Sequence, residues 1–372
     1  MATGPFILGQ PRAVTALGRA LNSGRMHHAW IFHGPRGTGK FRAAEALARI
    51  LLDPAAATAH RQSLEPPRDT PVQRLIDSGT HPDLHVIRKE LSAVSESREL
   101  RDRKQTNIPL DLLRERMLGG TSGDGRHHES AVFRTAALGH GKVFIVDEAE
   151  LLDADAQNAM LKTLEEPPAG TVIVLVTQRE DQLLATVRSR CQRVPFGPLA
   201  PEAMQEWWNR SGHAPGAEDR AFAEEFAEGA PGMAELALRH GLRAWAQELG
   251  PMLTEAESGG FNPAMADRMA ALADEFAAGI VDADERASKD AANRLAVRLM
   301  ARLLGVRIRR ALHDHSASPA ALARWLGASD ALHEFEQHVD RNVNLKLAFA
   351  NLAAQWAQRT APAPAAGGTR AR

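Results

Sequence analysis

The chain has 372 residues, with 44% apolar and 24% charged side chains, a net charge of -1 and a single cysteine. These values are typical of a globular protein of two or three domains, and they give no overall attraction to nucleic acid. No apolar run reaches the roughly 18 residues of a membrane span, no basic segment precedes an apolar stretch at the N-terminus, and one cysteine excludes an internal disulfide. We therefore expect a cytoplasmic protein without a membrane segment.

The first predicted elements surround a glycine-rich loop. A helix is expected over residues 13–23, a buried strand over Ala29–His33 and a second helix over Arg42–Leu52. The loop between the strand and the second helix reads GPRGTGK, which fits the G-x-x-x-x-G-K phosphate-binding pattern in the strand–loop–helix setting that the pattern requires. Its glycines let backbone N–H groups surround phosphate oxygens, and its lysine adds a point charge. The residues predicted to bind a nucleotide here are Gly34, Gly37, Gly39 and Lys40.

Phe41 breaks this pattern at its last position. The pattern requires Ser or Thr there, because a hydroxyl ligates the Mg2+ that accompanies a nucleoside triphosphate. An aromatic ring cannot replace that ligand. We therefore expect the fold of a phosphate-loop ATPase with compromised chemistry: no cofactor is required, and ATP with Mg2+ is a doubtful ligand.

The next segment contains one strand and one helix. Leu84–Ile87 reads as a short strand, and Leu110–Leu118 reads as an amphipathic helix. Between them, residues 88–104 are dense in charge, and Gly119–Ser130 is rich in turn residues, which predicts a mobile loop. The two histidines of that loop are expected to be solvated and not to bind a metal; they are His127 and His128.

Two further strands complete the predicted sheet. Lys142–Val146 is apolar and is followed by Asp147 and Glu148, a pattern in which the first acid holds a metal ion and the second polarises an attacking water. The other strand is Thr171–Thr177. Strands that alternate with helices form a parallel sheet with helices on both faces, and ligands bind at the carboxyl ends of such strands. Asp147, Glu148 and Thr177 are therefore predicted to belong to the nucleotide site.

Two motifs point to a family. Residues 149–168 read AELLDADAQNAMLKTLEEPP, and Ser189-Arg190-Cys191 follows the last of these strands. Both motifs resemble the clamp-loader branch of the AAA+ ATPases, and the resemblance extends over residues 6–200. It implies a P-loop AAA+ domain, a small helical lid domain and an all-helical collar domain through which subunits form a ring. The implied boundaries are residues 1–197, 198–255 and 256–360, followed by a disordered tail over 361–372.

Within this branch, three departures favour a non-motor subunit of the delta-prime type. Phe41 replaces the metal ligand, and Gly232 stands where motor subunits have an arginine that touches the nucleotide phosphate. The chain is also expected to end after one C-terminal helical domain, without the extension of a motor subunit. The complete acidic pair of Asp147 and Glu148 points the other way and leaves weak nucleotide binding open.

The resemblance implies one catalytic group, Arg190. In this family the arginine of the S-R-C motif acts across a subunit interface on ATP bound to the neighbour. The implied partners are motor ATPase subunits and a delta subunit in a hetero-oligomeric ring, and, through that complex, a sliding clamp and primed DNA at the bacterial replisome. The chain would be a subunit of the DNA polymerase III holoenzyme without ATPase activity of its own. The alternatives are a motor-type clamp-loader ATPase and a DNA-binding or chaperone-like AAA+ protein that acts alone.

Three smaller expectations concern other side chains. The four-cysteine zinc module that is usual in this family is not expected, because residues 53–78 contain no cysteine. Cys191 is expected to be a packed side chain and not a reactive thiol. A solvated helix face is favoured over a phosphate-binding patch for a group of four arginines, Arg302, Arg307, Arg309 and Arg310.

Overall fold

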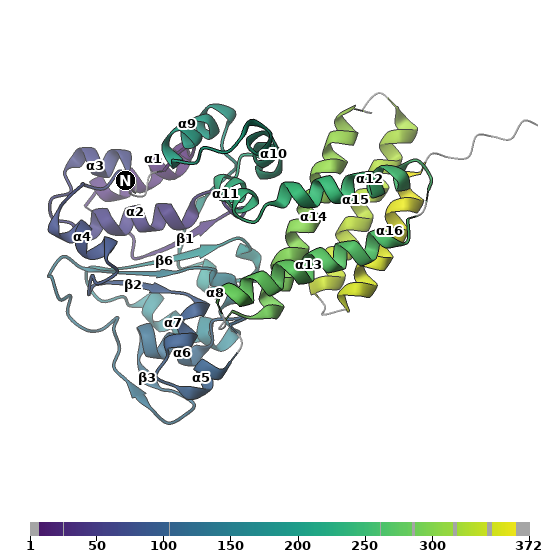
Figure 1. The fold of residues 1–372 in the computed structure, drawn as a ribbon. Helices are drawn as coiled ribbons and strands as arrows, with labels where there is room; N and C mark the ends of the chain where they lie inside the picture. The colour runs from purple at the N-terminus through teal and green to yellow at the C-terminus, as the bar shows by residue number, and fades with distance from the viewer. Residues whose placement is uncertain are drawn as a thin grey trace, which may run out of the picture. The chain divides into compact units, whose positions relative to one another are not determined.

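The computed structural model describes residues 7–24, 26–103, 105–260, 262–284, 287–314, 318–340 and 344–361. The chain divides into a first compact unit, residues 1–214 with 227–234, and a second compact unit, residues 215–226 with 235–372 (Figure 1). The predicted tail, Ala361 apart, lies outside the described residues. The three predicted domain boundaries stay predictions.

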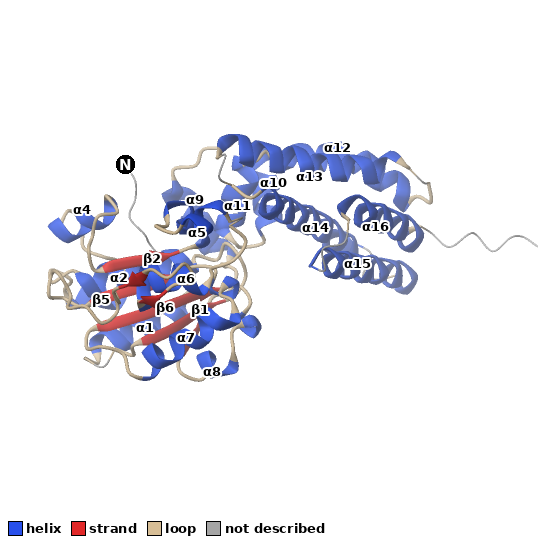
Figure 2. Ribbon diagram, turned by 90° about the horizontal axis from the view of Figure 1, so that it is seen from below, coloured by secondary structure: helices blue, strands red, loops and turns tan. Residues whose placement is uncertain are grey.

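A five-stranded parallel sheet forms the centre of the first unit. Its strands, in the order β2-β5-β6-β1-β7, are β2 (Leu84–Ile87), β5 (Lys142–Val146), β6 (Thr171–Thr177), β1 (Ala29–His33) and β7 (Gln192–Pro195). Figure 2 shows the sheet in red among blue helices. The four strands predicted from apolar runs are confirmed. The sequence does not predict β7, because at this edge of the sheet Val194 is the only buried residue of the strand.

Helices cover both faces of the sheet, because successive residues of a strand point to opposite sides. Phe32 packs into one core and Ile31 into the other. The predicted α/β fold, a P-loop AAA+ domain with a parallel sheet between helices, is confirmed. The first core contains α1 (Pro11–Asn22) and α2 (Lys40–Leu52), and the second contains α6 (Leu110–Leu113) and α7 (Ala154–Glu165).

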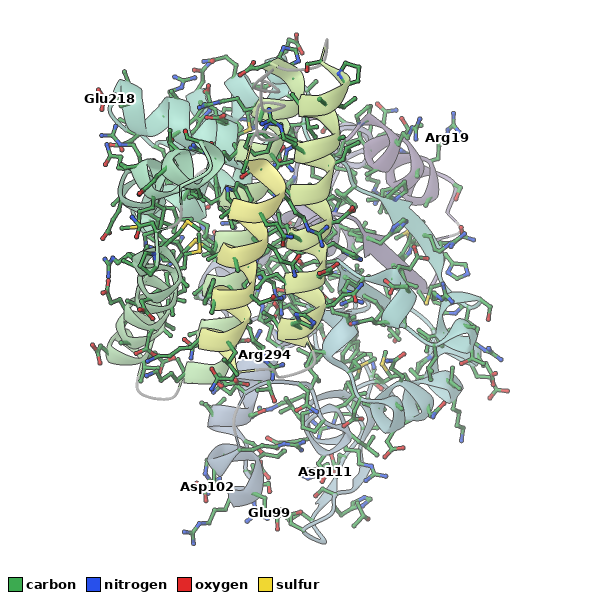
Figure 3. The ribbon with its side chains drawn as sticks, turned by 90° about the vertical axis from the view of Figure 1, so that its right-hand side faces the viewer. Arg19, Glu99, Asp102, Asp111, Glu218 and Arg294 are labelled. Atoms are coloured by element: carbon green, nitrogen blue, oxygen red, sulfur yellow. The ribbon has the colours of Figure 1, made fainter. Side chains whose placement is uncertain are left out.

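The charged stretch after β2 forms two short helices. They are the 3-10 helix η1 (Lys89–Val94) and α5 (Arg98–Asp102). The helix predicted over Leu110–Leu118 is α6 continued by a π-helical turn, η2 (Arg114–Leu118). Figure 3 shows acidic side chains of this region, Glu99, Asp102 and Asp111, at its outer surface.

The predicted loop at Gly119–Ser130 needs a correction. Its centre is an antiparallel hairpin of β3 (Gly120–Thr121) and β4 (His127–His128). His127 is exposed as expected, but the prediction that His128 is solvated is wrong, because His128 is buried with its Nε2 3.1 Å from the Ser122 Oγ. Adjacent residues of a strand face opposite ways, so the pairing of β4 buries one histidine and exposes the other.

Short elements complete the first unit. They are α3 (Thr58–Ser63), α4 (Pro71–Asp77), η3 (Ala149–Leu151), η4 (Glu180–Gln182), α8 (Ala185–Arg188) and α9 (Pro201–Ser211). Two further helices contribute residues to both units, α10 (Ala217–Ala227) and α11 (Pro231–Arg239).

The described residues of the second unit form helices and turns and no strand, and the predicted all-helical character of the C-terminal part is confirmed. Aromatic pairs form part of its core: the ring centroids of Trp325 and Trp356 are 6.0 Å apart, and those of Phe335 and Phe349 are 5.1 Å apart. In the described part of the chain, no helix combines the length and apolar character that crossing a bilayer requires. The long helices are α12 (Leu242–Glu257), α13 (Ala264–Ala283), α14 (Lys289–Asp314), α15 (Pro319–Asp340) and α16 (Leu345–Thr360).

Three arginines of α14, Arg302, Arg307 and Arg310, contact groups of their own unit. Arg302 Nε donates to the Phe226 carbonyl at 2.6 Å. Arg307 pairs with both carboxylate oxygens of Glu257, at 2.6 and 2.7 Å. Arg310 Nη2 lies 2.5 Å from the Glu225 carboxylate. These contacts favour the interpretation of a helix face over that of a phosphate-binding patch.

Candidate functional site

The glycine-rich loop joins β1 to α2 and has positive φ angles at its three glycines. Gly34, Gly37 and Gly39 have φ angles of 138, 79 and 91°, which side chains with a Cβ rarely adopt. A Cβ on Gly34 would lie 2.0 Å from the Phe196 carbonyl oxygen, so this position also has no room for one. The predicted loop is therefore present as a shaped turn at the N-terminus of α2.

Lys40 closes this loop on itself. Its Nζ donates to the carbonyl oxygens of Gly34 and Pro35, at 2.7 and 2.6 Å, and the residue is 6% exposed. Burial lowers the pKa of Lys40 to about 8, although the nearby Glu150 and Asp147 act in the opposite direction. The lysine thus lies among backbone acceptors of the glycine-rich loop.

The lowered pKa of Lys40 predicts how stability depends on pH. In the unfolded chain Lys40 keeps its proton up to its ordinary pKa of 10.5, whereas the folded chain releases it near about 8. Between these values the unfolded state binds more protons, so the free energy of unfolding rises with pH. Relative to Lys40→Met, the native chain should gain about 2–3 kcal/mol between the two values, measured by urea unfolding. A difference that stays constant with pH would contradict the burial of a charged lysine.

The two acids after β5 are each paired with a cation that follows β2. The register of these neighbouring strands places Ile87 opposite Val146, and the Asp147 N–H donates to the Ile87 carbonyl at 3.0 Å. The next residues therefore face each other. Arg88 Nε lies 3.3 Å from Asp147 Oδ2, and Lys89 pairs with Glu148.

Asp147 also has a perturbed pKa. Burial raises the pKa of its carboxyl, and the Arg88 charge counteracts this effect. The arginine therefore partly compensates for the removal of the acid from water.

Phe41 contacts the same arginine. The guanidinium of Arg88 lies over the Phe41 ring, 4.1 Å from its centroid, a cation–π geometry. Mg2+ requires oxygen ligands in near-octahedral geometry. Here position 41 provides no oxygen, and the carboxylate of Asp147 is paired with a guanidinium. These residues do not fit a magnesium ion.

Thr177 lies at the carboxyl end of β6, beside the end of β1. The register pairs it with His33, the residue before the loop. Its hydroxyl accepts from the Arg179 N–H at 3.0 Å, and the residue is buried. The structure thus brings all the predicted nucleotide-site residues to the carboxyl ends of three neighbouring parallel strands. They are Gly34, Gly37, Gly39, Lys40, Asp147, Glu148 and Thr177. Their binding of a nucleotide stays a prediction.

Gly232 contacts the loop through its backbone. Its N–H donates to the Gly37 carbonyl at 2.9 Å, and a Cβ at this position would lie 2.9 Å from the Gly37 Cα. Both residues belong to the first unit. The start of α11 therefore packs directly on the phosphate-binding loop, where a side chain at position 232 would not fit without movement.

Arg190 lies at the opposite end of the strands, just before the amino end of β7. It precedes β7, which runs parallel to β1, whereas the glycine-rich loop follows β1. The length of β1 places the two ends about 15 Å apart. Arg190 donates to the Thr186 carbonyl at 2.8 Å and pairs with Glu165, and 33% of its side chain is exposed. It is therefore outside the chain's own predicted nucleotide site.

Cys191 is packed against the core, as expected. It lies at the border of the cluster that contains Ile31, and burial raises the pKa of its thiol to about 12. The thiol is therefore protonated in the folded chain.

More than half of the chain, residues 9–200, matches the family model described as DNA polymerase III, delta subunit. The chain belongs to this family. The predicted relationship to subunits of this polymerase is confirmed.

The relatives that this chain resembles have names of two kinds, delta' and gamma/tau. The DNA polymerase III subunit delta' of Bacillus subtilis is 31% identical over 197 residues, which are 53% of this chain and 50% of that protein. Subunit delta' of Pseudomonas aeruginosa is 32% identical over 186 residues, 50% of this chain and 47% of that protein. Subunit gamma/tau of Mycobacterium bovis is 31% identical over 208 residues, 54% of this chain and 29% of that protein.

The chain spans about half the length of the delta' relatives and less of the gamma/tau relative. A solved structure of a DNA polymerase III gamma subunit-related protein from Thermotoga maritima aligns over 94% of this chain and 99% of that chain, with 18% identity and a TM-score of 0.39. Since both kinds of name occur among the relatives, similarity alone does not separate the delta-prime type from the motor type.

Sequence reasoning missed Arg88 and Lys89 as site residues. Both belong to the charge-dense stretch that follows β2, and no motif marks them. A signal does exist: two cations follow one strand and two acids follow another, so the four side chains meet wherever these strands are neighbours.

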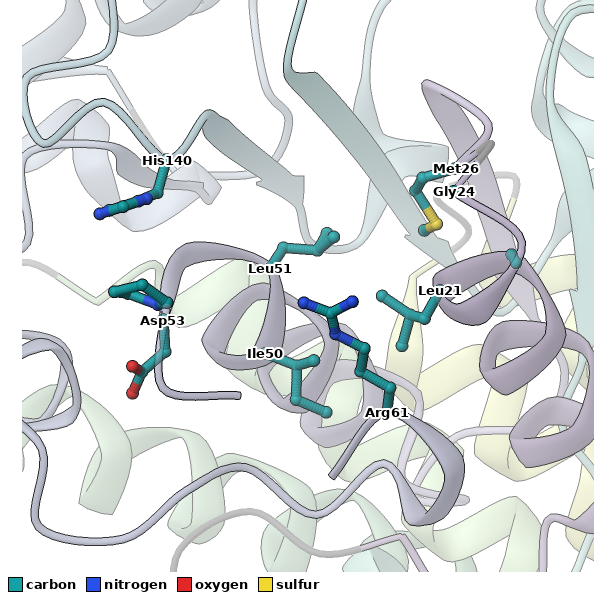
Figure 4. Close-up of a pocket in the computed structure, with 10 residues that line it drawn as sticks. Leu21, Gly24, Met26, Ile50, Leu51, Asp53, Arg61 and His140 are labelled. Carbon is teal, nitrogen blue, oxygen red and sulfur yellow. The ribbon is translucent and has the colours of Figure 1, made fainter. Parts of the chain in front are cut away.

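The pocket in Figure 4 lies away from this site. It has a volume of about 280 Å3 and is lined by the ends of α1 and α2, including Leu21 and Ile50, with Asp53 and Arg61 at its border. Since α2 begins at the glycine-rich loop, its 13 residues separate pocket and loop by about 20 Å. Among the residues that the structure describes, no group of three or more His, Cys, Asp or Glu side chains is placed to hold a metal ion.

Proposed function

We propose that this family member is a non-motor, delta-prime-type subunit of the DNA polymerase III clamp loader, and that it gives Arg190 as an arginine finger to ATP bound by a neighbouring subunit. The observation that carries the proposal is the position of Arg190. It is partly exposed at the amino ends of the strands, whereas the chain's own glycine-rich loop lies at their carboxyl ends. A cation at the amino ends acts on a nucleotide only if another subunit brings that nucleotide to it. Such a finger contributes about 10³–10⁵ in rate.

The chain's own site supports the non-motor part of the proposal. Phe41 offers no ligand to a metal ion, and Asp147 is paired with Arg88. The resemblance implies that motor subunits have an arginine at position 232 that touches the nucleotide phosphate. Here Gly232 stands at that position, and its backbone packs on the loop. The chain would therefore contribute architecture and one side chain, without ATPase activity of its own.

The partners follow from this role. They would be motor ATPase subunits and a delta subunit in a hetero-oligomeric ring of the cytoplasmic replisome, with the sliding clamp and primed DNA reached through the ring. When the chain is mixed with these subunits, native mass spectrometry should show a ring of fixed stoichiometry. A chain that stays alone under these conditions would favour an AAA+ protein that acts independently.

A motor-type ATPase is the second candidate. The complete pair of Asp147 and Glu148 favours it, as does the similarity to a gamma/tau subunit. The two candidates differ in what the glycine-rich loop does, since a motor subunit needs its lysine for turnover.

Lys40→Ala distinguishes these candidates. In the assembled complex with clamp and primed DNA, we expect this substitution to change steady-state ATP turnover little, because position 41 and the pairing of Asp147 already compromise the site. The control is the same substitution at the corresponding lysine of a motor subunit, which should reduce turnover strongly. A loss greater than about tenfold with Lys40→Ala, equivalent to about 1.4 kcal/mol in the barrier, would support the motor type.

A further inference from the structure

The carboxyl edge of the sheet holds a cation that is part of the chain itself. Arg88 is fixed on two sides: its Nε lies 3.3 Å from Asp147 Oδ2, and its guanidinium lies 4.1 Å from the centroid of the Phe41 ring. The backbone hydrogen bond from the Asp147 N–H to the Ile87 carbonyl belongs to the strand register that holds Arg88 beside Asp147. The arginine therefore contacts the two positions from which a phosphate-loop protein normally coordinates its metal ion.

We propose that the Arg88 guanidinium takes the place of the divalent cation in this loop, so that any nucleoside phosphate held by Gly34–Lys40 is held without Mg2+. A guanidinium carries one positive charge and five N–H donors, and it binds phosphate oxygens as a fork. The Arg88 side chain is 42% exposed, so part of this donor set is accessible to a ligand. This inference does not depend on Arg190 or on the place of the chain in a complex.

Phe41 and Arg88 act as a pair in this arrangement. The flat face of the ring supports the guanidinium, whereas a serine at position 41 would provide a metal ligand but no such face. Phe41→Ser alone leaves Arg88 paired with Asp147. Removing Arg88 alone leaves the Phe41 ring at the position where a metal ion needs an oxygen ligand. Metal binding should therefore return only when both residues are changed.

Four proteins test this coupling: the native chain, Phe41→Ser, Arg88→Gln and the double variant. The probe is Mn2+, which prefers the same oxygen ligands as Mg2+, added with ATP and followed by the electron paramagnetic resonance signal of free Mn2+. We expect no more Mn2+ uptake by the native chain and by Phe41→Ser than by ATP alone. The double variant should bind one Mn2+ per chain at least about tenfold more tightly than Phe41→Ser, and Asp147→Asn in that background should abolish the binding.

Arg98→Gln is the matched control, since it removes the same charge from an exposed arginine, 86% accessible, on nearby α5. In the Phe41→Ser background it should take up no more Mn2+ than ATP alone. Asp147-dependent uptake of one Mn2+ by the native chain, or by Phe41→Ser as tightly as by the double variant, would overturn the proposal. A folded double variant that takes up no Mn2+ would overturn it as well.

Thermal unfolding gives a second test on the same proteins. Arg88→Gln leaves the partly buried Asp147 without its counter-charge, so its Tm should fall below that of Arg98→Gln. About 1 mM Mn2+ should raise the Tm of the double variant and leave the Tm of Arg88→Gln and of the native chain unchanged, because an ion stabilises only the protein that binds it. An equal rise in Tm in the native chain and in the double variant would contradict the replacement of the metal by Arg88.

Discussion

Replacing Arg190 with alanine should leave the chain folded and able to join the complex, yet slow the ATP hydrolysis that clamp and primed DNA stimulate. The side chain is partly exposed, and its contacts with the Thr186 carbonyl and Glu165 lie at the surface, so its loss should cost little stability. At the neighbouring ATP site, the loss of the cation should lower the rate by about 10³–10⁵. Turnover of the whole complex should fall less, because in the proposed ring the other sites would take their arginines from motor subunits.

The Arg190 experiment has two controls. Arg190→Lys should rescue poorly, since a point charge does not reproduce the planar guanidinium fork. Arg193→Ala removes a more exposed arginine from adjacent β7, where it pairs with Glu180, and should have no effect on the rate. Complexes of Arg190→Ala that assemble and load clamps at the native rate would show that this arginine is structural.

Gly34→Ala should be among the most destabilising single substitutions in the first unit. The new Cβ would lie 2.0 Å from the Phe196 carbonyl oxygen, and the residue has a φ of 138°. Backbone strain and a steric clash with backbone atoms together should cost about 3–5 kcal/mol. The measurement is urea unfolding of the full chain.

Gly79→Ala is the matched control for this substitution. Gly79 also has a positive φ, 70°, but a Cβ there would meet nothing within 4 Å. It should cost about 1–2 kcal/mol, from backbone strain alone. Equal losses for the two variants would show that the contact between Gly34 and Phe196 relaxes without cost.

The sheet could be predicted because most of its strands carry a local signal. Thr171–Thr177 is buried along its whole length, as its unbroken apolar run indicates. β7 could not be predicted, because an edge strand with one buried residue has little apolar pattern to show. The hairpin that buries His128 is set by pairing between two-residue strands, too short for any periodicity to appear.

The candidate site was predictable only in its motifs. The spacing of Gly34, Gly37 and Gly39 predicts the loop, because few residues other than glycine adopt their φ angles. The contact of Arg88 with Asp147 depends on which strands are neighbours, and the sequence order of β2 and β5 does not state this. The hydrogen bonds from Lys40 to the carbonyls of Gly34 and Pro35 likewise depend on three-dimensional packing, which the sequence does not show.

Cys191 makes this chain convenient for site-specific chemistry. It is the only cysteine of the sequence, and burial raises the pKa of its thiol to about 12, so little reactive thiolate exists at neutral pH. A cysteine introduced at an exposed position should therefore take a fluorophore or spin label in the folded protein faster than the native thiol does. Cys191 also directly follows Arg190, so the time that a maleimide needs to reach it reports whether the segment that carries the arginine has opened.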